Sequence, residues 1–240
     1  MEDFLEFLRR KSYLLTAMGA FILVLIIKGL FPKAIPFGLF EFWAITGPLL
    51  DGIIAGWPIF AWGAGISIIG AVLTRNNPEV NRNAERLLWG GFFISAFAGI
   101  TEEIAFRWLI FLNAIWGIKL TNFLFFDFAG FGIPRIIYTY VVAPVTNFVT
   151  VGQARGIIYH PLGWFVGSAV IAANAKFRDG HKYQGIFGWI NSWFGGLFLF
   201  WLMFKHGLVA CIIVHFLYDM LIFIVAYIDA AIERARGFTK

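Results

Sequence analysis

The stretch GLVACIIVHFLYDMLIFIVAYI, residues 207–228, is long and apolar enough to cross a lipid bilayer as one α-helix. A transmembrane helix needs about 20 mainly apolar residues, because the hydrocarbon core is about 30 Å thick and each helical residue rises about 1.5 Å. His215 and Asp219 are the imidazole and carboxyl side chains in this stretch. A run of this kind decides the fold class: it predicts an integral membrane protein whose spans are α-helices.

The composition of the whole chain supports the same prediction. Hydrophobic residues make up 60% of the 240 residues and charged residues 14%, whereas soluble domains contain about 25% charged residues. A soluble fold of this size has no interior large enough for so much apolar side chain. The 10 tryptophans and 29 phenylalanines fit aromatic belts at the membrane interfaces. We therefore expect the lipid bilayer as a partner and no nucleic acid.

Further apolar runs predict an all-α, polytopic transmembrane bundle of about six to eight spans. It forms a single domain over residues 1–240, with a motif-bearing core at about 88–228. The runs cover residues 13–31, 44–73, 87–118, 156–175, 183–204 and 207–228. Run 44–73 is long enough for one tilted helix or a broken one. In segment 119–155, Pro134 and Pro144 argue against a single straight helix.

Basic residues gather in three segments: the N-terminus, the polar loop at 74–86 and the C-terminal tail. Lysine and arginine in short loops favour the cytoplasmic side of a membrane. An even number of crossings places all three segments on that side, so we expect both termini to be cytoplasmic. Because no eukaryotic targeting signal is visible, the sequence favours a prokaryotic cytoplasmic membrane.

The segment TEEIAFR, residues 101–107, places charged side chains inside the apolar run 87–118. An ionisable residue at the bilayer centre costs at least about 2.5 kcal/mol, so it is a candidate functional residue by default. Glu103 and Arg107 lie four residues apart and can form an ion pair on one helix face. Glu102 is rotated by about 100° and is expected to point elsewhere. This spacing favours a structural Glu103–Arg107 pair with Glu102 free for chemistry; the alternative is one stabilising network.

Histidines supply the other candidate positions. His215 and Asp219 lie four residues apart on one helix face, and a carboxylate beside an imidazole fixes its tautomer. The alternative is a pair that only joins two helices. His181 lies in FRDGHKYQG, residues 177–185, a polar interruption between two apolar runs that by itself is typical of a short loop.

This inventory supports two chemistries. A carboxylate with an imidazole can activate water as a general base, and a second imidazole can donate a hydrogen bond to a developing oxyanion. The same groups could instead bind a divalent metal. The sequence contains no HExxH, the commonest zinc-protease helix motif. We therefore predict no cofactor and keep a divalent metal as the alternative.

The three motifs resemble those of the CPBP group of intramembrane peptidases, the CAAX-protease and bacteriocin-processing proteins, also called the Abi group. The family pattern is EExxxR, then FxxxH, then HxxxN or HxxxD, each in apolar surroundings. Here the motifs read EEIAFR at 102–107, FRDGH at 177–181 and HFLYD at 215–219. The resemblance covers the chain from Glu102 onward, and residues 1–90 match only as generic membrane helices.

The resemblance implies an intramembrane endopeptidase acting on a membrane-associated peptide or lipidated protein, a prenylated CAAX terminus being one candidate substrate. It implies that Glu102 activates the attacking water with His181 beside it. Glu103 and Arg107 would hold the motif helix in place. His215 and Asp219 would stabilise the tetrahedral oxyanion.

Two departures from the family pattern affect these roles. Asp219 stands where an asparagine amide can donate a hydrogen bond directly. An ionised aspartate repels an oxyanion, so Asp219 must be protonated or act by orienting His215. Arg178 and Asp179 are charged where smaller apolar residues are expected, which predicts that His181 lies near an aqueous boundary.

Two other functions remain open from the sequence. Intramembrane charges also mark ion and solute pathways in transporters, although no internal repeat of the kind many transporters carry is visible here. A non-catalytic membrane scaffold could use the same charged motifs for helix packing.

Overall fold

A computed structural model of the chain describes residues 2–74 and 84–235, and these residues form helices joined by turns and loops, without a strand. The all-helical class predicted from the sequence is therefore confirmed. In chain order the elements are α1 (Glu2–Leu30), η1 (Glu41–Trp43), α2 (Leu49–Ala55), α3 (Trp57–Thr74), α4 (Ala84–Glu102), η2 (Glu103–Ile110), α5 (Phe111–Leu124), η3 (Asp127–Ala129), α6 (Ile133–Ile137), η4 (Tyr138–Val142), α7 (Ala143–Val149), α8 (Arg155–Ile158), α9 (Trp164–Gly180), η5 (Lys182–Gln184), α10 (Gly185–His206) and α11 (Leu208–Ala235).

Among the described residues, three helical runs are long and apolar enough to cross a membrane: Leu88–Leu124, Lys182–His206 and Leu208–Ile232. A fourth candidate is the pair Leu49–Ala55 and Trp57–Leu73, which is bent by 43°. Of the two structures predicted for run 44–73, the structure therefore has the broken helix and not the single tilted one. The bend falls at Gly56, where a Cβ atom would lie 3.0 Å from Val214 Cγ1 of α11, so this position has little room for a side chain.

The segment between α5 and α10 differs in its boundaries from the predicted runs. Residues 133–149 form one continuous helical run of α6, η4 and α7, in which Pro134 and Pro144 lie in the first turns of α6 and α7, and the short helix α8 follows. The predicted run 156–175 is interrupted, because Gly163 has φ of 125°, a conformation that favours glycine, and α9 begins only at Trp164. Helix α9 continues to Gly180, so Arg178 and Asp179 lie in its last turn and not in a loop. The predicted loop 74–86 lies largely outside the described residues.

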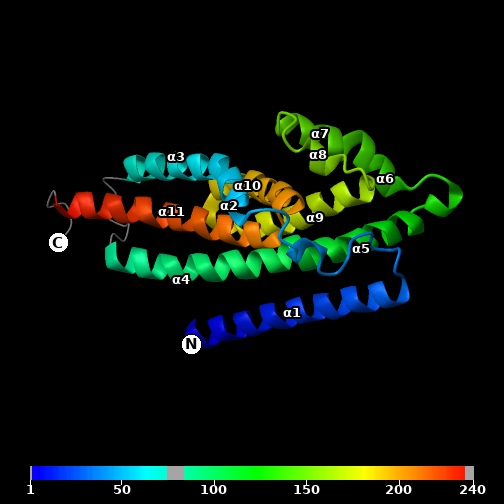
Figure 1. Cartoon of the computed structure of the whole chain (residues 1–240), viewed down its shortest axis with the longest axis horizontal. Helices are drawn as coiled ribbons and strands as arrows, with labels where there is room; N and C mark the ends of the chain where they lie inside the picture. The colour runs from blue at the N-terminus through cyan, green and yellow to red at the C-terminus, as the bar shows by residue number, and fades with distance from the viewer. Residues whose placement is uncertain (1, 75–83, 236–240) are drawn as a thin grey trace.

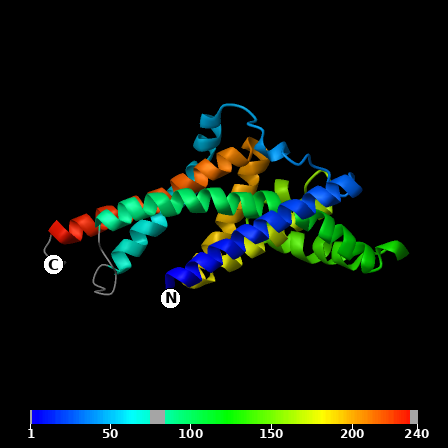
Figure 2. The same cartoon turned by 90° about the horizontal axis from the view of Figure 1, so that it is seen from below.

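The long helices pack around α11. Helix α4 runs beside α11, α3 lies on the other side of α11, and α1 runs along η2 and α5 (Figure 1). Helix α9 packs between α5 and α10, and the short helices α6 to α8 lie at the far end of α5 and α9. In the perpendicular view α4 again follows α11, and α10 crosses them (Figure 2).

A stripe of small residues brings α4 and α11 into close contact. Gly91, Ser95 and Gly99 are buried at intervals of four, and the next residue in this series is Glu103. A Cβ atom on Gly99 would lie 3.1 Å from the carbonyl oxygen of Ile212 in α11. Small residues at such spacing let membrane helices approach closely. This contact therefore sets the distance between Glu103 and the part of α11 that carries the histidine.

We predict that Gly99→Leu lowers the thermal unfolding midpoint of the detergent-solubilised protein, because the new side chain meets the α11 backbone. Overpacking of this kind costs about 1–3 kcal/mol. Gly90→Leu is the matched control, since a Cβ atom at Gly90 has no neighbour within 4 Å. Equal midpoints for the two variants would contradict the proposed close contact between α4 and α11.

Candidate active site

Three segments that are far apart in the sequence bring their polar side chains together. Glu102 and Glu103 lie where α4 continues into the π-helical η2, His181 caps the C-terminus of α9, and His215 lies in the second turn of α11. The six residues predicted from the sequence gather at this place. Their distances, however, assign partners that the sequence spacing did not predict.

The two glutamates lie at the junction of two helix types: Glu102 is the last residue of α4 and Glu103 is the first residue of the π-helical η2. A π-helix accommodates an extra residue per turn and is frequent at functional sites. Glu102 and Glu103, expected to face different partners, both approach His215. Glu103 Oε1 lies 2.7 Å from His215 Nδ1, and Glu102 Oε2 lies 3.9 Å from His215 Nε2. The two carboxylates therefore face the two different ring nitrogens of the same imidazole.

Glu103 and Arg107 form a completely buried ion pair. Both side chains have 0% exposure, and Arg107 Nη1 lies 3.2 Å from Glu103 Oε1. The approach lacks hydrogen-bond geometry, so charge attraction links the two groups. The guanidinium also lies 3.9 Å from the centre of the Phe177 ring. This predicted pair thus extends to His215 and α9, and it joins three elements of the site.

Glu102 faces both histidines. Its Oε2 atom lies 3.8 Å from His181 Nε2 and 3.9 Å from His215 Nε2. This oxygen is buried and has no hydrogen-bond partner among the described residues. Polar atoms at such separations are suited to sharing a water molecule. The arrangement can therefore hold a water between one carboxylate and two imidazoles.

The backbone of α9 fixes the tautomer of His181. Its Nδ1 atom lies 2.8 Å from the carbonyl oxygen of Phe177. Because a carbonyl can only accept, Nδ1 must carry the hydrogen, and the neutral ring then presents an unprotonated Nε2 toward Glu102. The Phe177 ring also packs against the ring of His181, with centroids 4.6 Å apart and an angle of 53° between the ring planes. The FxxxH spacing thus has a direct structural meaning, since its first residue orients its last.

Arg178 and Asp179 hold the end of α9 against α10. Arg178 Nη2 lies 2.8 Å from Asp179 Oδ1, and the Trp189 indole donates to the same oxygen over 3.1 Å. These hydrogen bonds, from Trp189 first and then Arg178, lower the pKa of Asp179 below its ordinary value. The two charges that departed from the family pattern therefore stabilise the turn that carries His181.

Asp219 lies close to the site without a hydrogen bond to His215. Its Oδ2 atom is 3.7 Å from His215 Nε2, beyond hydrogen-bond distance. The carboxylate that orients His215 is therefore Glu103, and the orienting role expected for Asp219 does not fit the geometry. Asp219 shares the Nε2 side of the imidazole with Glu102, where it can act on a group bound in front of that nitrogen.

A small cavity of about 90 Å³ opens beside these residues, and its lining includes His181, His215 and Asp219. A chain of hydrogen bonds forms part of its wall: Trp62 Nε1 donates to Asn191 Oδ1 over 2.7 Å, and Asn191 Nδ2 donates to Tyr218 Oη over 3.0 Å. Sequence reasoning missed this chain. Asn191, a polar amide within the apolar run 183–204, was the available signal.

Metal ligation was the alternative chemistry for this inventory. Within residues 2–74 and 84–235, no group of three or more histidine, cysteine, aspartate or glutamate side chains has an arrangement that could hold a metal ion.

No protein-family model matches the chain, and no curated protein or solved structure is significantly similar to it. The likeness to the CPBP peptidases thus stays a prediction based on the three motifs.

The two neighbouring glutamates are predicted to differ in their effect on stability. Glu103→Gln leaves the buried Arg107 without its counter-charge, and breaking a buried pair costs about 3–5 kcal/mol. We therefore expect a clearly lower thermal unfolding midpoint in detergent. Glu102→Gln removes a carboxylate that faces other polar groups without a hydrogen bond, so its midpoint should equal or exceed that of the unmodified protein. If Glu102→Gln proves the more destabilising change, this assignment of structural and free carboxylates is wrong.

Proposed function

We propose that this chain is an intramembrane endopeptidase of the glutamate type, which hydrolyses a peptide bond of a membrane-associated substrate. The observation that carries the proposal is the position of Glu102, whose unpartnered oxygen faces His181 Nε2 and His215 Nε2 at 3.8 and 3.9 Å. A carboxylate and an unprotonated imidazole around one water are the parts that general-base activation requires.

In the proposed reaction, Glu102 takes a proton from the water while the water oxygen attacks the peptide carbonyl. His181 accepts a hydrogen bond from the same water through Nε2 and so fixes its position. The new carbon–oxygen bond produces a tetrahedral oxyanion. When the carbon–nitrogen bond breaks, Glu102 returns the proton to the leaving amine, so no covalent enzyme intermediate forms.

His215 supplies the stabilisation of the oxyanion. Its Nδ1 donates a hydrogen bond to Glu103. In the proposed reaction the ring is doubly protonated, so that Nε2 also carries a hydrogen and donates it toward the substrate oxygen. A fixed donor aimed at a developing charge contributes about 2.7–4 kcal/mol in comparable oxyanion holes. Asp219, 3.7 Å from Nε2, acts on the same oxyanion when it is protonated. Glu103 and Arg107 are positioning residues in this scheme.

The proposal extends to the substrate and the topology. The substrate is a peptide or lipidated protein at the membrane, a prenylated CAAX terminus among the candidates. We also propose six to eight crossings with both termini cytoplasmic, which fits the apolar runs and the three basic segments, in a prokaryotic cytoplasmic membrane. The exposed fractions of 16% for His181 and 26% for Glu102 support access of water to the site.

One observation favours a scaffold as the second candidate. Glu103, Arg107 and His215 form a closed, buried network that joins η2 and α11, and such a network can stabilise a bundle without any reaction. A scaffold alone, however, does not explain why the buried Oε2 atom of Glu102 has no hydrogen bond among the described residues while it faces both histidines.

We predict that the purified protein cleaves members of a peptide library that includes farnesylated CAAX peptides. Glu102→Gln, His181→Ala and His215→Ala should each lower kcat/KM by at least about 100-fold, because each removes a group that acts in proton transfer or on the oxyanion. Mass spectrometry of the products identifies the cleaved bond, and thermal unfolding checks that the variants fold.

Asp51→Asn is the control for this assay, because Asp51 is an exposed carboxylate at the start of α2. It should retain full activity. If no peptide is cleaved by the unmodified protein and Glu102→Gln is strongly destabilised, the scaffold reading replaces the peptidase.

Asp219 gives a separate prediction. Asp219→Asn places an amide where a donor to the oxyanion is needed, so we expect it to keep activity within about tenfold of the unmodified protein. Asp219→Ala has no donor and should lose at least ten times more activity than Asp219→Asn. The ratio of the two kcat/KM values measures the donor role, and equal values would argue against it.

A further inference from the structure

The small cavity beside the candidate active site extends past the residues that act in the proposed reaction. Besides His181, His215 and Asp219, its lining includes three apolar side chains, one amide and one phenol from α3, α10 and α11: Ile59, Leu199, Ile222, Asn191 and Tyr218. A peptide whose scissile bond lies at His215 has a neighbouring side chain within reach of this cavity. The cavity wall is therefore in a position to select that side chain.

The indole of Trp62 fixes the direction of both hydrogen bonds in the chain that joins Trp62, Asn191 and Tyr218. An indole N–H can only donate, so the atom of Asn191 that lies 2.7 Å from it is the amide oxygen. The amide nitrogen, which can only donate, then lies 3.0 Å from Tyr218 Oη. The Tyr218 oxygen is thus the acceptor of this bond, and its own hydrogen must point to another group.

The Tyr218 hydroxyl is a positioned donor without an acceptor among the described residues. Asn191 holds its oxygen, and helix α3 holds its ring, because a Cβ atom on Gly63 would lie 2.6 Å from Tyr218 Cε2. Tyr218 and Asn191 both line the cavity, so the hydroxyl hydrogen is available to a group bound there. The cavity therefore favours an occupant that carries a hydrogen-bond acceptor.

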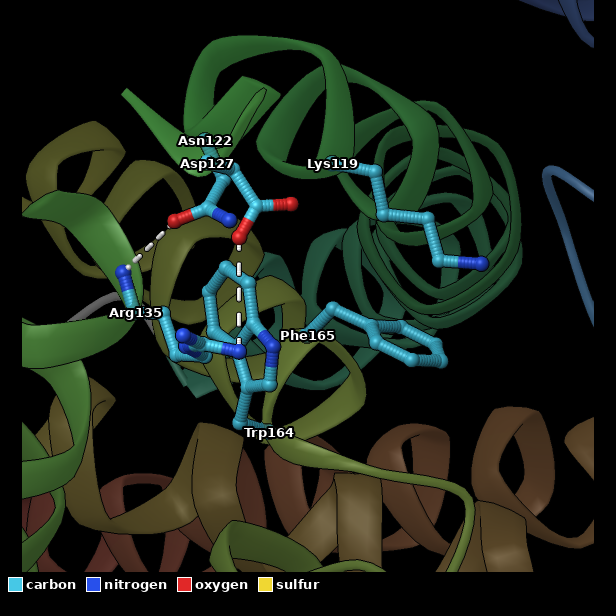
Figure 3. A pocket seen from close by; sticks show the side chains of 6 residues that line it. All are labelled: Lys119, Asn122, Asp127, Arg135, Trp164 and Phe165. Atoms are coloured by element: carbon cyan, nitrogen blue, oxygen red, sulfur yellow. Dashed lines mark hydrogen bonds and ion pairs between the residues drawn. The ribbon is translucent and has the colours of Figure 1, made fainter. Parts of the chain in front are cut away.

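A larger cavity, of about 310 Å³, lies between α5, η3, α6 and the start of α9, and it lacks this property (Figure 3). Arg135 Nη1 lies 4.0 Å from Asp127 Oδ1, and the backbone N–H of Arg135 donates to Asn122 Oδ1 over 2.9 Å. The Lys119 ammonium points away from these groups and donates to the carbonyl oxygen of Ala34 over 3.0 Å. Its polar groups thus have partners in the chain, whereas the Tyr218 hydroxyl is left for a ligand.

The volume of the small cavity limits the size of its occupant. It measures about 90 Å³, whereas a cavity of about 150 Å³ holds benzene with its six carbons. A side chain of three or four heavy atoms therefore fits, and a phenyl ring does not. Ile59, Leu199 and Ile222 offer apolar contacts to a methyl group, and Tyr218 offers a donor to an oxygen. A threonine side chain carries both groups within three heavy atoms.

We propose that the small cavity is the subsite for a threonine side chain next to the scissile bond of the substrate. This inference rests on the proposed peptidase function and adds a residue preference to it. The Tyr218 hydroxyl donates to the threonine Oγ, and the threonine methyl packs against the apolar side chains. Valine has the same shape but leaves the donor unpaired, which is the kind of difference that hydrogen-bonding sites discriminate strongly.

The test uses the purified full chain in detergent and a peptide that it cleaves, with the cleaved bond identified by mass spectrometry. The peptide is remade with threonine, valine or phenylalanine at each of the two positions that flank this bond. At one of these positions we expect kcat/KM for threonine to exceed that for valine by at least about tenfold and that for phenylalanine by at least about 100-fold. Tyr218→Phe should bring the threonine-to-valine ratio to about one.

Tyr227→Phe is the matched control, because it removes a hydroxyl from the same helix α11 but does not line the cavity. It should keep the ratio of the unmodified protein. The comparison of the peptides with the unmodified protein needs no variant, so it decides the matter even if Tyr218→Phe does not fold.

The outcomes separate the two proposals. Equal rates for threonine and valine, efficient cleavage with phenylalanine at both positions, or an unchanged ratio in folded Tyr218→Phe overturns the subsite and leaves the peptidase in place. If the folded, unmodified protein cleaves no peptide, the proposed function is overturned and the subsite with it.

Discussion

A buried carboxylate, that of Glu103, is the group on which the rest of this arrangement depends. It has no exposed surface, it carries the charge opposite to that of Arg107, and it holds the imidazole of His215 through Nδ1. A charge inside a membrane protein is tolerated only when it is paired. Arg107 and His215 supply that pairing from η2 and α11, so the stability of the bundle and the orientation of the histidine have the same origin.

This carboxylate can reach His215 because α4 and α11 lie unusually close. Gly91, Ser95 and Gly99 present almost no side chain to α11, and Glu103 continues the same series. A hydrogen bond of 2.7 Å does not survive a separation of one or two ångström more. The glycines of α4 are therefore as important for the site as its charged residues, although they take part in no chemistry.

Polar groups along the long helical run Leu88–Leu124 have different roles. Near its middle, two carboxylates and two histidines surround a place suited to water. Near its end, Lys119 Nζ donates to the carbonyl oxygen of Ala34 over 3.0 Å and lies 4.1 Å from the centre of the Phe165 ring. The same helical run thus carries the carboxylates of the proposed reaction centre and a lysine that holds the loop after α1.

The helical class, with apolar runs long enough to span a membrane, and the six residues that meet at the site were predictable from the sequence, because hydropathy and i, i+4 spacing are local properties. Run 44–73 was open between one tilted helix and a broken one, and the packed structure decided it. The contact partners of these six residues could not be predicted from the sequence. The spacing assigned Asp219 to His215, whereas packing placed Glu103 beside Nδ1 and Glu102 on the Nε2 side of the same ring. The meeting of His181 with Glu102 likewise joins segments far apart in the chain, whose distance only the packed helices decide.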